Sequence, residues 1–177
     1  LPNGYKAQIT IDGDTAAITT VLLSEHKYKV DDKEAGYPLL VPVIDQSGER
    51  LDSFQLGKLK IEGRPEIFHL DQGCWQFSSP KTTGDYTSVV FTATIVNQKQ
   101  KEILQIQKIY TYRRKNYELE LQLRFMNKSL LPLRIESLEF YGPMGMMRED
   151  PRTDMRTCVT AFLDPAGQME TGRQMLS

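Results

Sequence analysis

The chain has 177 residues, of which 40% are hydrophobic and 25% are charged, as in an ordinary globular protein. Its formal net charge of -1 excludes a global electrostatic attraction to nucleic acid or to anionic lipid. No apolar run approaches the roughly 20 residues that span a bilayer. The first residue is Leu1, and no basic-then-apolar signal segment follows it, so we expect an excised piece of a longer protein.

Strand-like alternation recurs along the chain from its first residues. Ala7, Ile9 and Ile11 alternate with polar residues, and the turn sequence 12–14 follows them. Pro42 cannot donate to a ladder, so its segment should lie at a sheet edge or be irregular. In chain order, the further strand candidates are residues 16–24, 39–44, 58–63, 65–70, 74–79, 82–96, 101–113, 117–125 and 131–142.

Residues 117–125 alternate without exception. The apolar positions are Tyr117, Leu119, Leu121, Leu123 and Phe125, and every position between them is polar. Because successive side chains of a strand point to opposite faces, this pattern predicts one apolar face that is buried against an opposing sheet. The strand is expected to supply scaffold and no chemistry.

Helical periodicity is almost absent, and no strand–helix–strand alternation occurs. About nine to twelve strands joined by short turns predict an all-β protein, built as an antiparallel β-sandwich. We expect a single domain over residues 1–177.

The last part of the chain differs in composition. Residues 142–177 hold six of the seven methionines and three prolines without clean alternation, which predicts an irregular segment packed on the sandwich or leaving it. Methionines there form a pliable apolar surface for a partner, or they fill gaps in the core. The candidate partner-contact residues are Met144, Met146, Met147, Met169 and Met175.

The sequence offers few candidate catalytic residues. The only histidines are His26 and His69, and the proximity of Asp71 and Cys74 to His69 invites a nucleophile-and-base interpretation. Nothing in the sequence forces these three side chains into alignment, so we predict that the histidines are structural or lie at the surface and that the protein is non-catalytic.

The two cysteines, Cys74 and Cys158, do not have the spacing of zinc ligands. They form a disulfide, or they are two separate buried thiols, and the sequence leaves both alternatives open. We expect no cofactor and no metal.

Two polar motifs have alternative interpretations. The first is the basic turn of Arg113, Arg114 and Lys115, which could contact a phosphate or a lipid headgroup. The alternative is a hairpin tip whose charges keep it soluble, and the near-neutral total charge favours this alternative. Residues 127–129 match a glycosylation acceptor, a short pattern that often arises by chance.

Residues 109–143 resemble the periplasmic domain of YidC-type membrane-protein insertases. In that family a strand ends in a basic turn, here at 113–116, and Tyr117 opens a strictly alternating strand that Asn127 closes. The next strand begins at Pro132 and Leu133.

Residues 9–29 resemble the first hairpin of the same domain. The family often has a Gly pair where this chain has Ala16 and Ala17, so the turn should be less extreme or shifted onto Gly13. The GPMG segment, 142–145, is similar to that of more divergent bacterial members, and residues of about 35 to 85 carry no resemblance.

The resemblance implies a large twisted supersandwich, as in galactose-mutarotase-like proteins. It also implies a location on the periplasmic face of the bacterial inner membrane, tethered by membrane helices that this chain does not contain. The insertase activity belongs to those helices. This domain would assist membrane-protein insertion and folding by contacting translocon subunits or nascent membrane proteins.

Two other classes of protein compete with this one. A carbohydrate-binding or aldose-epimerase-like protein would share the fold, but its enzyme form needs a His acid and a carboxylate base, and only His26 and His69 are available for the acid. An extracytoplasmic adhesion or assembly module of unrelated ancestry is the second alternative.

Overall fold

The structure, a computed structural model, describes the backbone of residues 5–27, 36–146, 156–163 and 169–176 and the side chains of residues 5–25 and 36–146. It divides the chain into two compact units, Leu1–Met146 and Met147–Ser177, which are described separately.

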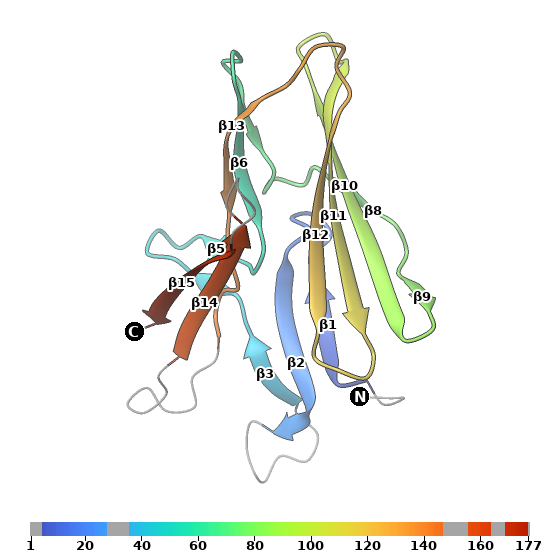
Figure 1. Ribbon diagram of the computed structural model, residues 1–177, viewed down its shortest axis with the longest axis vertical. Coiled ribbons are helices and arrows are strands. Elements are labelled where there is room, and N and C mark those ends of the chain that lie inside the picture. The colour runs from blue at the N-terminus through green and yellow to red at the C-terminus, as the bar shows by residue number, and fades with distance from the viewer. Residues whose placement is uncertain (1–4, 28–35, 147–155, 164–168, 177) are drawn as a thin grey trace. The chain divides into compact units, whose positions relative to one another are not determined.

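Every regular element in the described residues is a β-strand, so the expected all-β fold is confirmed (Figure 1). In chain order the strands are β1 (Ala7–Ile11), β2 (Ile18–Lys27), β3 (Gly36–Leu40), β4 (Val43–Ile44), β5 (Arg50–Leu51), β6 (Leu56–Ile61), β7 (Ile67–His69), β8 (Trp75–Phe77), β9 (Lys81–Thr83), β10 (Tyr86–Val96), β11 (Glu102–Arg113), β12 (Leu119–Asn127), β13 (Ile135–Phe140), β14 (Arg156–Leu163) and β15 (Met169–Leu176). None of the described segments forms a helix of the length and hydropathy needed to cross a membrane.

The first unit is built from antiparallel sheets. Three strands pair in the order β1-β2-β3, and four pair in the order β12-β11-β10-β8, with β9 also on β10. A third sheet has the order β13-β6-β7, and β4 pairs with β5. Figure 1 shows β10, β11 and β12 side by side, with β6 next to β13 apart from them. The supersandwich arrangement itself stays a prediction.

The sheets of the first unit share one hydrophobic core. Ile18 of β2, Leu59 of β6, Phe91 of β10 and Ile106 of β11 come from three different sheets and belong to one buried cluster. Each of the four is at most 3% exposed. Burial of large aliphatic and aromatic side chains contributes about 1.5–3 kcal/mol apiece, so this cluster dominates the stability of the unit.

The alternating strand lies as its pattern predicts. In the β11–β12 pairing Tyr110 stands opposite Leu121 and Tyr112 opposite Leu119, so the apolar side chains of both strands share a face. Leu119, Leu121 and Leu123 are half-buried against the core.

The expected burial is wrong at both ends of residues 117–125. Tyr117 is 43% exposed and Phe125 is 39% exposed. The reason is topological, because among the described strands β12 is the outermost of its sheet and pairs only with β11. The strand also begins at Leu119 and leaves Tyr117 in the turn.

Pro42 and several residues with left-handed backbone lie in the connections between strands. Pro42 lies between β3 and β4, outside both strands, as its missing N–H predicts. In the β1–β2 turn, the Asp12 carboxylate accepts hydrogen bonds from the N–H groups of Asp14 and Thr15 at 2.8 and 2.9 Å. The left-handed conformation falls on Ala16, with a φ of 50°, and not on Gly13.

The second unit contains a β-hairpin. β14 and β15 pair antiparallel from Arg156 opposite Leu176 to Leu163 opposite Met169. A regular hairpin therefore replaces the irregular structure expected for these strands, while the single domain expected over 1–177 stays a prediction.

Candidate functional site

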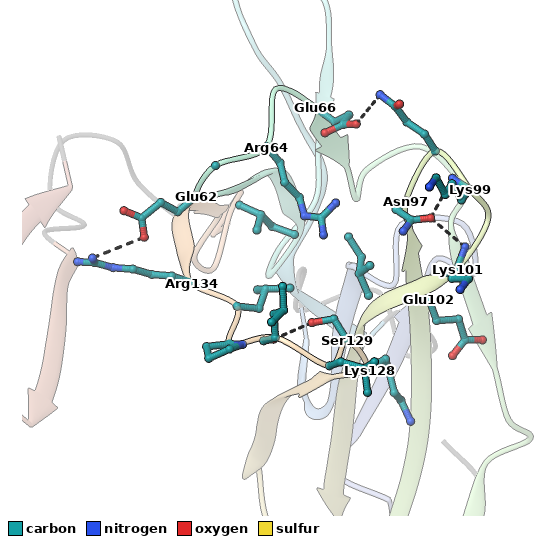
Figure 2. Close-up of a pocket in the computed structure, with 18 of the residues that line it drawn as sticks. Glu62, Arg64, Glu66, Asn97, Lys99, Lys101, Glu102, Lys128, Ser129 and Arg134 are labelled. Atoms are coloured by element: carbon teal, nitrogen blue, oxygen red, sulfur yellow. Dashed lines mark hydrogen bonds and ion pairs between the residues drawn. The ribbon is translucent and has the colours of Figure 1, made fainter.

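An open cleft of about 1160 Å³ lies where three chain connections meet. It is lined by the β6–β7 connection (62–66), the β10–β11 connection (97–101) and the β12–β13 connection (128–134) (Figure 2). Ile61 of β6 and Ile103 of β11 also line the cleft and add apolar surface from the neighbouring strands.

Side-chain caps fix the β10–β11 connection. The Asn97 side-chain oxygen accepts hydrogen bonds from the N–H groups of Lys99 and Lys101 at 2.9 and 3.0 Å. A short polar side chain that satisfies main-chain donors in this way holds a turn in one conformation.

A second asparagine fixes the β12–β13 connection. The Asn127 oxygen accepts a hydrogen bond from the N–H of Ser129 at 2.9 Å, and its amide nitrogen donates to the Leu131 carbonyl at 2.8 Å. The Ser129 hydroxyl donates to the same carbonyl at 2.8 Å. These bonds explain the residue pattern at 127–129 as turn chemistry, and the glycosylation interpretation stays a prediction.

This hydrogen-bonded connection presents two leucines to the outside. Leu130 is fully exposed and Leu131 is 73% exposed, and both line the cleft. Isolated exposed leucines are common, but two adjacent ones on a fixed loop at a concave surface form an apolar contact area.

Charged groups surround the leucines. Arg134 pairs with Glu62 at 3.6 Å, and Gln98 donates to one oxygen of Glu66 at 2.9 Å. The other oxygen of Glu66, Oε2, is buried and accepts no hydrogen bond from the described residues. Buried acceptors are normally satisfied, so this oxygen is one of the exceptions in the described part of the chain.

A smaller cavity of about 410 Å³ opens between β1 and the β10–β11 pair. Tyr112 lines it, and its buried hydroxyl has no hydrogen-bond partner among the described residues. Burial raises the pKa of Tyr112, and the nearby main-chain N–H groups of Ala7 and Lys6 oppose this change without reaching hydrogen-bond geometry.

Within the described residues, no hydrogen bond joins the Cys74 thiol to His69 or Asp71. The His69 ring nitrogen is 3.7 Å from the Asp71 carboxylate, whereas the Cys74 sulfur lies 3.7 Å from the Leu70 carbonyl oxygen. Burial raises the pKa of the Cys74 thiol, which opposes formation of the reactive thiolate. His69 lines neither cavity. His26 lies in β2, and its side chain is outside the described residues.

The candidate methionines divide into described and undescribed positions. Met146 packs against the core and bridges Leu40, which fits the gap-filling interpretation. Met144 is half-buried, and its N–H donates to the Ser53 hydroxyl at 2.8 Å. Met147 and the side chains of Met169 and Met175 lie outside the described residues, so their role as partner contacts stays a prediction.

The basic turn after β11 is internally paired. Arg113 lies 3.6 Å from the Glu118 carboxylate and stacks 4.7 Å over the Tyr86 ring. Lys115 lies 3.3 Å from Asp85. These contacts fit a solvated hairpin tip better than a free anion site.

One buried lysine was not expected from the sequence. Lys108 lies on the core face of β11, fully buried, and its ammonium donates to the carbonyl oxygens of Ala16 and Phe54. It also lies 5.5 Å from the ring centroids of Trp75 and Tyr110. The signal was present, because Lys108 interrupts the apolar alternation of residues 104–112 at a core position.

The fold and the cleft together define an all-β protein with a partly apolar, partly charged groove. No family model matches the chain, and no curated protein or solved structure matches it either.

Proposed function

We propose that this chain is the non-catalytic accessory domain of a YidC-type membrane-protein insertase, on the periplasmic side of the inner membrane. In this proposal the domain contacts translocon subunits or nascent membrane proteins, while the membrane helices of the whole protein carry out insertion. The resemblance of residues 109–143 and 9–29 to that domain supports the family. The all-β structure is compatible with it.

One observation carries the contact role. Leu130 and Leu131 are exposed at a concave surface on a loop whose main chain is held by Asn127 and Ser129. A loop that is already ordered loses little conformational entropy on binding, so its apolar contact favours a complex more than a flexible loop would. Stable folding alone gives no reason to expose this pair.

The test is co-purification from membranes of the full-length protein and its Leu130→Ser/Leu131→Ser double variant. We expect the variant to retain less translocon and less nascent membrane protein. The control variant, Ile44→Ser/Ile67→Ser, removes exposed apolar side chains outside the cleft, at 62% and 46% exposure, and should behave as the unmodified protein does. Equal retention by all three proteins would contradict the contact role.

A further inference from the structure

We propose that the cleft selects extended polypeptide segments in which acidic residues accompany large apolar ones. The inference deepens the proposed function and rests on it, because it assigns a chemical class of partner segment to the contact surface.

Basic side chains without an acidic partner among the described residues are the first observation that supports an acidic binding partner. Arg64, Lys99, Lys101 and Lys128 line the cleft, and within the described part of the chain none of them lies within ion-pair distance of a carboxylate. Figure 2 shows the Arg64 guanidinium extending from the β6–β7 connection toward the opening between the connections. These groups are free to meet carboxylates of a partner.

The charge balance of the cleft opposes that of the chain. Outside the Arg134–Glu62 pair, the cleft is lined by four basic residues and by two acidic ones, Glu66 and Glu102, so its lining is locally positive. The whole chain carries a formal charge of -1. The attraction for an anionic partner is therefore local to this site, which orients the partner as well as recruiting it.

The shape of the site favours a polypeptide over a membrane surface. The site is a cleft enclosed by three connections, and Leu130 and Leu131 line it together with the charged groups. An extended segment can place its apolar side chains on the leucines and its carboxylates against Arg64 and Lys128.

The binding experiment uses the 177-residue chain and fluorescein-labelled peptides, followed by fluorescence anisotropy. The first peptide alternates Asp and Leu, the second replaces Asp with Lys, and the third replaces Leu with Ser. We expect the Asp–Leu peptide to bind, the other two to bind about tenfold more weakly or worse, and added salt to raise the Kd.

Matched variants locate the site. Arg64→Glu/Lys128→Glu should raise the Kd of the Asp–Leu peptide by about tenfold, whereas Arg124→Glu/Lys81→Glu, with the same charge change on exposed residues outside the cleft, should change it by less than about twofold. Far-ultraviolet circular dichroism confirms that each variant is folded.

Each other outcome overturns the inference. Equal binding of the Asp–Leu and Lys–Leu peptides removes the selection for acidic segments and leaves the proposed function standing. Binding of phosphatidylglycerol vesicles, without binding of any peptide, assigns the cleft to lipid. If no probe binds, the inference fails, and the co-purification of the Leu130→Ser/Leu131→Ser variant decides the proposed function separately.

Discussion

The ammonium nitrogen of Lys108 lies 2.6 Å from the carbonyl oxygen of Phe54, which is 54 residues away in sequence. The same nitrogen donates to the carbonyl oxygen of Ala16. Both acceptor residues have left-handed backbone, with φ of 50° at Ala16 and 62° at Phe54. A buried amine therefore ties two strained connections to β11, and no carboxylate in the described residues pairs with it.

This arrangement predicts a pH dependence of stability. Burial lowers the pKa of Lys108 to about 7 from its ordinary value of 10.5, although the two carbonyl acceptors favour the charged form. Between these pH values the unfolded chain binds more protons at this site than the folded chain does. The free energy of unfolding should therefore rise from about pH 7 toward pH 10, by up to about 1 kcal/mol per pH unit.

Urea unfolding at several pH values checks this dependence. Lys108→Met should lose the rise, and Lys101→Met, which changes an exposed lysine, should keep it. Parallel profiles for the unmodified chain and Lys108→Met would mean that Lys108 is charged in both states throughout.

Two neighbouring tyrosines should respond differently to loss of the hydroxyl. Tyr110 donates to the Ala16 carbonyl at 2.8 Å, so Tyr110→Phe should lower the free energy of unfolding by about 0.5–1.5 kcal/mol. The Tyr112 hydroxyl is buried without a described partner, so Tyr112→Phe should be neutral or stabilising. Denaturant melts of both variants give the comparison, and a larger loss for Tyr112→Phe would show an undescribed partner.

The two faces of β12 should differ in their contribution to stability. Leu121 is half-buried against the core, so Leu121→Ala should cost about 1–3 kcal/mol, which overlaps only the lower part of the range for fully buried leucines. Glu120 is exposed on the opposite face, and Glu120→Ala should cost about 0.5 kcal/mol or less. Equal costs in thermal or urea unfolding would mean that the outer face is covered as well.

The local pattern of apolar and polar residues predicted the strands, and it predicted which side chains of residues 117–125 share a face. It could do so because side-chain alternation is a property of neighbouring residues. It could not predict that β12 is an edge strand, which leaves Phe125 39% exposed, since sheet order depends on distant pairing. The acceptors of Lys108 lie in two remote turns and were equally hidden.

The cleft and the C-terminal hairpin show the same limit. Arg64, Lys101 and Lys128 are far apart in sequence and come together only because three connections meet at one end of the sheets. The β14–β15 hairpin was missed because its second strand, Met169–Leu176, has no clean alternation, and pairing with β14 compensates for its weak propensity.

The exposed leucines should contribute to contact and not to folding. Because Leu130 is fully exposed and Leu131 is 73% exposed, Leu130→Ser/Leu131→Ser should change the free energy of unfolding by about 0.5 kcal/mol or less. Differential scanning fluorimetry checks this result. A large loss of stability would show that the pair packs inside the protein, and any loss of binding would then have a structural cause.

Site-specific photo-crosslinking tests the central claim most directly. A photoreactive amino acid replaces Leu130 in the full-length protein, or Ile44 as the exposed control, and crosslinks are recorded during synthesis of a membrane protein. The account predicts crosslinks to the nascent chain or to translocon subunits from position 130 and few from position 44. Crosslinks from position 44 alone, or from neither position while insertion proceeds normally, would contradict the assignment of the cleft as the contact surface.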